Sequence, residues 1–280
     1  MNNTCYLPLT ATPWKQSEAY REILPESPGL AGIIRCFWGS ERPYRDRGEK
    51  PAGTLVIPDT CVDVIYDIDY TSNTITGRFC GINDSSFVTC GGREPGHLVS
   101  VFGIRFYAWA FSAFSEDSLK GTVNGFYDVR SRFGRLDRIL GQQLFEVDSL
   151  DERGRLVEHM LLGQAAPWRR QDTVEQAVGQ VLGHKGALSV EELARECLIS
   201  SRQLERLSHE YMGIPPKKFC SLVRYQYLWS EIVRSFDFHI LDAVSKYGYT
   251  DQSHLMREFK CYHTMDIRSA VRLARGAEEI

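Results

Sequence analysis

The stretch SVEELARECLISSRQLERL, residues 189–207, decides the fold of the second half of the chain. It contains two capping boxes, each of which marks the start of a helix, at Ser189 with Glu192 and at Ser200 with Gln203. We therefore expect a helix over Val190–Cys197, a turn through Leu198–Ser200 and a second helix over Ser201–Tyr211. This order predicts a helix-turn-helix unit.

The same organisation returns further along the chain. A helix over Ile240–Tyr247, a turn at Gly248–Thr250 and a helix over Asp251–Cys261 predict a second helix-turn-helix unit. Between the two units, Pro216–Ser235 has helical periodicity, and at about 1.5 Å per residue this helix would be about 28 to 30 Å long. Because major grooves on one face of DNA recur about every 34 Å, such a spacer could place two helices in adjacent grooves.

The remaining periodicity divides the chain into a β-rich half and a helical half. Further helices are predicted over Asp172–Leu182 and Ile267–Leu273. Before residue 107, short β-branched and aromatic runs separated by turn residues predict strands over Ile33–Trp38, Thr54–Ile57, Val62–Ile68, Thr74–Ile82, Phe87–Cys90 and Leu98–Tyr107. We expect an antiparallel barrel or sandwich there, and an α+β chain as a whole.

Two amphipathic helices follow the predicted strands. Their apolar faces carry Leu136, Ile139, Leu140 and Leu144, then Leu156, Val157, Met160 and Leu161. Such faces either cover the core of the β-rich half or form a dimer seam, and core cover is the simpler explanation. At 280 residues the chain has the length of two domains. We expect them at residues 1–165 and 172–280, with residues 166–171 as a linker.

Composition and charge narrow the class of protein. The net charge of −3 divides into −4 over residues 1–165 and +1 over residues 166–280, with a local excess of four cations over residues 201–275. A small basic recognition surface is therefore expected in the helical half. No apolar run reaches the roughly 18 residues of a membrane span, and the first residues lack a signal-peptide pattern, so we expect a cytoplasmic protein without membrane contact.

The chain offers little catalytic or metal-binding chemistry. Its eight cysteines lie far apart, without a zinc-ligand spacing, so reduced and buried thiols are expected, and no cofactor or metal is predicted. The four cysteines at 36, 61, 80 and 90 leave open a redox or metal sensor assembled by folding. No G-x-S-x-G, P-loop, H-E-x-x-H or G-x-G-x-x-G motif occurs, so we do not expect an enzyme.

Residues 172–275 resemble the DNA-binding module of the AraC family of bacterial transcription regulators. The matching positions follow the family's order and spacing: Leu193-Ala194, Ile199-Ser200-Ser201, Leu204, Arg206-Leu207, Gly213, Pro216, Phe219, Arg224, Gly248-Tyr249, Asp251-Gln252-Ser253, Leu255 and Arg257-Glu258-Phe259-Lys260. The chain departs from the family at Thr264-Met265-Asp266-Ile267, where a G-x-[ST]-P stretch is usual, and at Val244, where Ala is common.

The resemblance implies two base-reading helices. The first would read bases through Arg202, Gln203, Glu205 and Arg206, and the second through Gln252, Ser253, Met256 and Arg257. These side chains suit base edges, because Arg forks onto guanine, Gln onto adenine, Glu accepts from cytosine and Met contacts the thymine methyl group. Contacts to phosphate are expected from Lys217, Lys218 and Arg224.

The first half resembles, more weakly, the β-rich and often cupin-like sensor domains of that family, on Val56-Ile57-Pro58-Asp59, Cys61-Val62-Asp63 and Phe102-Gly103-Ile104-Arg105-Phe106. Family sensors usually bind a small effector. A small apolar or aromatic effector would meet Trp38, Asp63, Tyr66 and Arg105. The alternative for these residues is structural, with the aromatic rings filling the core and Asp63 pairing with Arg105. With only His97 and His159 in this half, a metal site of several histidines is not expected.

These patterns predict a DNA-binding transcription regulator, an effector-responsive activator that reads two adjacent major-groove segments. Its expected partners are an operator in double-stranded DNA, a small effector, RNA polymerase and a second copy of the chain. One alternative keeps DNA binding but replaces the effector with protein–protein contacts through residues 136–163, or with cysteine redox or metal sensing. A more distant alternative is a DNA alkylation-repair enzyme, whose P-C-H-R motif the chain lacks.

Overall fold

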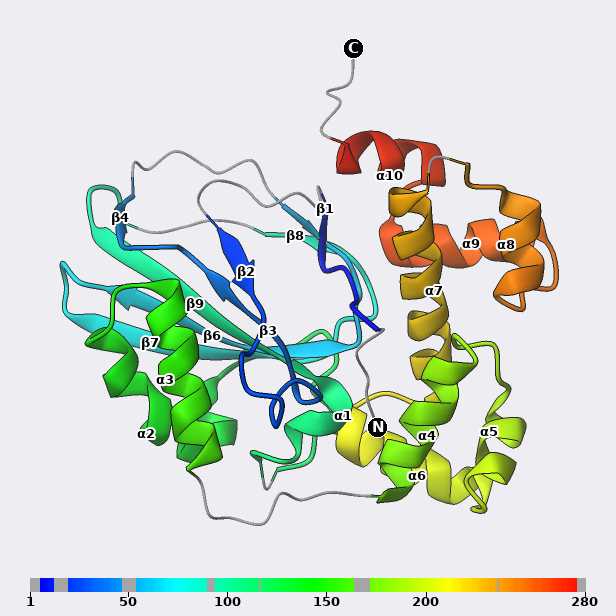
Figure 1. Ribbon diagram of the computed structural model, residues 1–280, viewed down its shortest axis with the longest axis horizontal. Coiled ribbons are helices and arrows are strands. Elements are labelled where there is room, and N and C mark those ends of the chain that lie inside the picture. The colour runs from blue at the N-terminus through cyan, green and yellow to red at the C-terminus, as the bar shows by residue number, and fades with distance from the viewer. Residues whose placement is uncertain are drawn as a thin grey trace.

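The computed structural model describes residues 6–12, 20–46, 54–89, 94–115, 117–163, 172–235 and 237–275. An antiparallel β-region, residues 6–163, lies beside a helical region, residues 172–275 (Figure 1). The predicted α+β class and the order of its parts are confirmed. The predicted linker at 166–171 lies outside the described residues. Within the described ranges, no helix has both the length and the apolarity that a membrane crossing needs.

The β-region is built on one large antiparallel sheet with a small one beside it. Along the large sheet the strands are β10 (Phe126–Asp128), β7 (Thr74–Cys80), β6 (Cys61–Asp69), β9 (Leu98–Tyr107), β3 (Ile34–Gly39) and β2 (Arg21–Ile23), with β4 (Tyr44–Arg45) also paired to β9. The small sheet consists of β1 (Ala11–Thr12), β5 (Leu55–Val56) and β8 (Phe87–Val88). In the described residues β10 and β2 are the ends of the large sheet, so the expectation of a closed barrel is wrong.

The alternating pattern of β6 places one set of its side chains in the core. Val64 pairs with Phe79 of β7 on one side and with Ile104 of β9 on the other, and all three are fully buried. On the opposite face the ring of Trp38 lies over Gly103, where an added Cβ would come within 2.2 Å of the indole. Only glycine fits this close approach of side chain to backbone.

Two helices cover one face of the large sheet, α2 (Val129–Phe145) and α3 (Leu150–Leu162) (Figure 1). The side chains of Asp128 and Ser149 cap their first turns. The predicted apolar faces point inward, since Leu136, Leu140, Leu144, Val157 and Leu161 are at most 2% exposed. Core cover is thus confirmed as the role of these faces. The short helix α1 (Ala108–Phe111) was not predicted.

All seven helices predicted after residue 171 form, with ends within two residues of those expected. They are α4 (Asp172–Gly183), α5 (Val190–Glu196), α6 (Ser201–Met212), α7 (Pro216–Arg234), α8 (Ile240–Lys246), α9 (Gln252–His263) and α10 (Ile267–Ala274). The last helix forms despite the unusual sequence before it. Thr264 adopts the left-handed conformation at φ 63°, and Asp266 caps α10 by accepting from the backbone N–H of Ser269 at 3.0 Å.

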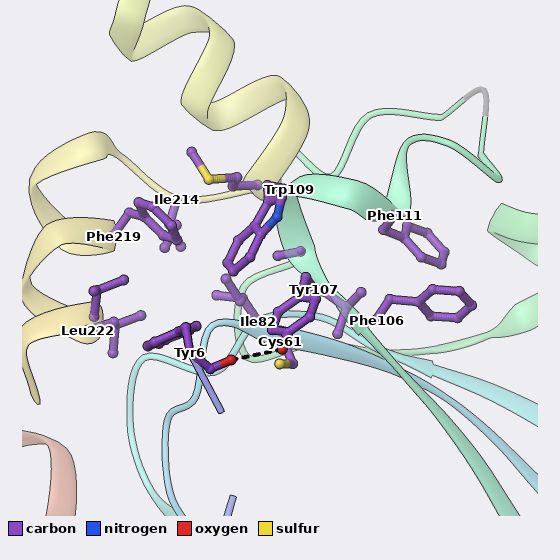
Figure 2. Close-up of a cluster of buried hydrophobic side chains, with 14 of the residues drawn as sticks. Tyr6, Cys61, Ile82, Phe106, Tyr107, Trp109, Phe111, Ile214, Phe219 and Leu222 are labelled. Carbon is purple, nitrogen blue, oxygen red and sulfur yellow. Dashed lines mark hydrogen bonds between the residues drawn. The ribbon is translucent and has the colours of Figure 1, made fainter. Parts of the chain in front are cut away.

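The apolar core continues from the β-region into the helical region (Figure 2). Trp109 of α1 meets Phe219 of α7 edge to face, with ring centroids 5.7 Å apart. Tyr6 packs against Tyr227 of α7 at 5.3 Å. Gln226, 1% exposed, accepts from Leu9 N and donates to Leu9 O, both at 2.8 Å, and also donates to Pro58 O. The two regions are therefore packed as one body.

Candidate nucleic-acid interface

The first helix-turn-helix unit consists of α5, a turn and α6. Ser189 and Glu192 form the reciprocal capping box that the sequence predicts. At the second predicted box, Ser200 Oγ accepts from Gln203 N at 3.2 Å. Leu193 of α5 and Leu204 of α6 are both buried, at 1% and 3% exposure, and the two helices pack against each other. This packing fixes the angle at which α6 projects.

The predicted base-reading residues of α6 form one exposed surface at its N-terminal half. Arg202, Gln203, Glu205 and Arg206 are all exposed. Arg206 is paired with Glu210 one turn further along, with Nη1 3.1 Å from Oε2, yet its side chain remains 64% exposed. An exposed pair of this kind is weak, so a nucleic acid could draw the guanidinium away from Glu210.

The second unit consists of α8, a turn at Gly248 and α9. Gly248 has φ +67°, a conformation that glycine adopts without strain. Asp251 caps α9 by accepting from His254 N at 2.7 Å. Gln252, Ser253 and Arg257 are exposed, whereas Met256 is half-buried. The first three stand on the solvent face of α9, as predicted.

Lys260 belongs with these residues, although sequence reasoning did not select it. It is exposed and lies three residues after Arg257 and seven after Ser253, which places it on the same side of α9. The helical spacing of 253, 257 and 260 was the signal that could have identified it.

The helix α7 joins the two units. Its 19 residues correspond to about 28 Å at 1.5 Å per residue. It is held rigid by a core in which Trp229 lies against Phe259 and His263 of α9, with ring centroids 5.8 and 4.4 Å away. Burial lowers the pKa of His263 to about 4, so this histidine is neutral at neutral pH.

The three residues predicted to contact phosphate occupy different environments. Lys217 is exposed at the start of α7. Lys218 is paired with Asp84 of the β-region, with Nζ 3.1 Å from Oδ2. Arg224 forks onto Glu258 of α9 at 3.0 and 2.7 Å, lies over the ring of Tyr249, and is 15% exposed. The structure therefore does not favour Arg224 as a phosphate contact. Its guanidinium is bound to Glu258 and attaches α9 to α7.

The structure brings together three of the four residues predicted to meet an effector. Trp38 Nε1 donates to Asp63 Oδ1 at 2.8 Å, and Arg105 Nε donates to the same oxygen at 3.0 Å. The guanidinium of Arg105 also lies 5.7 Å from the indole centroid. Burial raises the pKa of Asp63, and the charge of Arg105 opposes that rise. The structure thus matches the alternative to an effector site, in which Asp63 pairs with Arg105.

Tyr66, the fourth predicted residue, lies on the other face of the sheet. A side chain at Gly77 would collide with the ring of Tyr66 and with Val129 of α2. Tyr66 is fully buried beneath that helix. The prediction that it shares a site with Arg105 is therefore wrong. Successive residues of a strand point to opposite faces, and Tyr66 lies three positions after Asp63, the residue opposite Arg105.

The cysteines of the β-region have little thiolate character. Burial raises the pKa of both Cys36 and Cys80 to about 12, and that of Cys61 well above its ordinary value. The thiolate is the form that reacts with oxidants and binds metals. Cys90, the fourth cysteine of the sensing alternative, lies outside the described residues. The described residues hold no cluster of three or more potential metal ligands.

Comparison with known proteins gives partial matches. A family described as a domain of unknown function (DUF6597) matches residues 21–125. No curated protein matches the chain. Among solved structures, ToxT from Vibrio cholerae with a bound unsaturated fatty acid is 11% identical, covers 87% of this chain and 98% of its own, and has a TM-score of 0.42.

A second solved structure matches a smaller share of this chain. The DNA-binding domain of the transcriptional factor AdpA, in complex with a target DNA, is 19% identical and has a TM-score of 0.35. It covers 39% of this chain and 100% of its own. At these identities and TM-scores a shared function does not follow from the likeness to either structure.

Proposed function

We propose that this protein is a transcription regulator that binds specific sequences of double-stranded DNA through α6 and α9. The observation that carries the proposal is the pair of exposed polar surfaces at the N-terminal halves of these helices, one in the unit before α7 and one in the unit after it. Both surfaces carry an arginine and a glutamine, the side chains that form two hydrogen bonds to guanine and adenine in the major groove. The proposal includes no catalytic activity.

The length of α7 supports simultaneous reading. About 28 Å of helix approaches the roughly 34 Å that separates successive major grooves on one face of DNA. We infer two contact blocks in the operator, about one helical turn apart. Lys217, exposed at the start of α7, is the residue that we propose for phosphate contact.

The proposal is tested by selecting bound sequences from a randomised DNA pool with the full-length chain at two salt concentrations. Phosphate contacts weaken as salt rises, whereas base contacts carry the sequence preference. We expect a site with two blocks about one turn apart that is retained at the higher salt. Recovery of unrelated sequences at both concentrations would contradict the proposal.

We also propose that a small aromatic or apolar effector controls the regulator. A cavity of about 360 Å³ lies where Tyr6–Pro8 meets α7 and α8, and its lining includes the rings of Tyr227 and Tyr247 beside Arg234. The lining also includes Glu231, whose carboxylate is paired with Lys246 at 2.9 Å. With that carboxylate paired, Arg234 beside the aromatic walls suits an aromatic anion. A molecule bound there would contact both regions and could therefore favour one arrangement of them over another.

An aromatic anion, 8-anilinonaphthalene-1-sulfonate, serves as the probe for this cavity. We expect its fluorescence to rise with the wild-type chain, and Ser230→Trp, which fills the cavity from α7, to weaken its binding by about tenfold. Equal binding to the two chains would remove the cavity as the effector site.

Activation through RNA polymerase, self-association and a cytoplasmic location are further parts of the proposal, suited to a regulator that acts on the chromosome.

A further inference from the structure

Two loops of the β-region form a single unit, which we call the loop platform, residues 81–86 and 117–125. They follow β7 and precede β10, which pair with each other at Cys80 and Phe126. Asn124 fastens them: its backbone N–H donates to Ile82 O at 2.9 Å, its side-chain Oδ1 accepts from Asp84 N at 2.9 Å, and its Nδ2 donates to Asp84 Oδ1 at 2.6 Å. Gly81 N also donates to Gly125 O.

The loop platform binds the C-terminal end of α6. Leu119 N and Ser118 Oγ both donate to the carbonyl oxygen of Glu210, at 3.0 and 3.1 Å. The backbone approaches closely here, since an added Cβ at Gly213 would come within 2.8 Å of Leu119 O. The carboxylate of the same Glu210 holds Arg206, one of the proposed base-reading residues.

The loop platform also binds the C-terminal end of α9. Ser86 Oγ donates to the carbonyl oxygen of Tyr262. Beside it, Asp84 is paired with Lys218 at 3.1 Å, and the ammonium group of Lys218 lies 5.5 Å from the ring centroid of Tyr262. The pairing contributes to lowering the pKa of Asp84, so the carboxylate stays charged at neutral pH.

In both contacts, the loop platform donates to a backbone carbonyl group in the last turn of a helix. The last four carbonyl groups of a helix have no partner within that helix, and donors from elsewhere can bind them. Glu210 and Tyr262 each belong to the last turn of a proposed recognition helix. One rigid unit of the β-region thus supplies donors to the corresponding ends of both helices, independently of their connection through α7.

We propose that the loop platform is a brace that sets the distance and angle between α6 and α9, and so the operator spacing that the protein accepts. This inference rests on the proposed DNA-binding function. Asp84, Ser86 and Asn124 are its positioning residues, and none of them is among the residues proposed to contact DNA. When two binding heads are joined rigidly, the second contact is favoured only at the spacing that the joint permits.

The test compares spacing discrimination, the ratio of Kd for an operator with one base pair inserted between its two blocks to Kd for the selected operator. Asn124→Gly removes the side-chain fastening while permitting the φ of 55° that Asn124 adopts. The matched control is Asn73→Gly in the β6–β7 hairpin, because Asn73 also has φ 55°. The double variant Asp84→Ala/Ser86→Ala loosens the brace at α9 without changing backbone freedom.

We expect the wild-type chain and Asn73→Gly to bind the altered spacing about tenfold more weakly, and the two brace variants to discriminate by less than about threefold. Circular dichroism verifies that each variant is folded. If Asn124→Gly is unfolded, the double variant alone tests the brace. If a folded brace variant discriminates between the two spacings as strongly as the wild-type chain, the brace is overturned. It is also overturned if a brace variant binds operators of every spacing more tightly than the wild-type chain does. Failure of the wild-type chain to select any DNA sequence overturns the proposed function itself.

Discussion

The guanidinium of Arg224 on α7 forks onto the carboxylate of Glu258 on α9, with Nε 3.0 Å from Oε1 and Nη2 2.7 Å from Oε2. The hydroxyl of Tyr249 donates to Oε1 at 2.9 Å, and Ser221 donates to Oε2 at 2.9 Å. Both side chains of the pair are about 85% shielded from solvent, at 15% and 13% exposure. The second unit is thereby attached to α7 by a charged network with every partner in place.

Arg224→Met should lower the free energy of unfolding by about 3 kcal/mol, because it leaves the buried Glu258 carboxylate without its cation. Urea denaturation measures the change. The control is Arg206→Met, which breaks a pair whose arginine is 64% exposed and should cost less than about 0.5 kcal/mol. Equal losses in the two variants would contradict a structural role for the Arg224 pair.

Arg206→Ala and Arg257→Ala should each weaken binding to the selected operator by about 1 to 3 kcal/mol and relax the preference at one base position. The physical reason is the loss of a two-pronged contact to guanine. Fluorescence anisotropy on matched and mismatched operators measures both effects. Arg272→Ala, an exposed arginine of α10 outside both units, is the control. A loss that is uniform across sequences would instead make these arginines phosphate contacts.

Leu198→Gly should stabilise the protein by about 0.5 to 1 kcal/mol. Leu198 has φ 55° in the turn of the first unit, and the residue is 90% exposed, so strain is relieved while little packing is lost. The converse change, Gly248→Ala at φ +67° in the second unit, should destabilise by a similar amount. Thermal denaturation distinguishes the two, and destabilisation by Leu198→Gly would be the contrary result.

The stability should fall as the pH is lowered from 7 to 4, through His263. Burial lowers the folded pKa of His263 to about 4, below the ordinary value of about 6.5. The unfolded chain therefore takes up this proton first, and the stabilisation present above pH 6.5 decreases by roughly 3 kcal/mol as the pH approaches 4.

His263→Phe isolates this effect. The ring still stacks on Phe259, which lies 4.9 Å away, while the titrating group is removed. The variant loses the 2.8 Å hydrogen bond to Tyr225 at every pH, so the slope of stability against pH is the measurement, not its absolute value. An unchanged slope in urea denaturation between pH 7 and 4 would exclude His263 as the group responsible.

Gln226→Ala should destabilise the packing between the two regions by about 2 kcal/mol, since it leaves Leu9 N without a partner in a partly buried position. Hydrogen exchange at the amide of Leu9 is the direct readout. We expect faster exchange there, with unchanged protection of Val64 in the centre of the sheet. Uniformly faster exchange at both sites would instead indicate global destabilisation.

The helical region was predictable because its determinants are local. Ser189, Ser200 and Asp251 cap helices by accepting from the backbone three positions away, and these signals fix helix ends without knowledge of the tertiary structure. The β-region was harder to predict from the sequence. Strands of three residues, such as β2 and β10, have no periodicity of their own and form because longer strands, β3 and β7, pair with them.

The candidate site shows the same division. Exposure of Arg202 and Arg257 follows from helical spacing, whereas the commitment of Arg224 depends on Glu258, 34 residues away in sequence. The joining of Trp38, Asp63 and Arg105 requires the registers of three strands, and their separate positions in the chain do not reveal it. The loop platform is least predictable of all, because it acts through backbone carbonyl groups that any residue could supply.

The contact between Trp109 and Phe219 bears on how such a chain can evolve. Both side chains are buried, at 6% and 1% exposure, and they pack against each other across the boundary between the two regions. Exchanging either half for that of a relative would open an apolar seam unless Tyr6, Trp109 and Phe219 were exchanged with it. Recombination at the junction is thus constrained by the complementary shapes of the two surfaces. A substitution on one side of the junction requires a matching substitution on the other, so the two halves must evolve together.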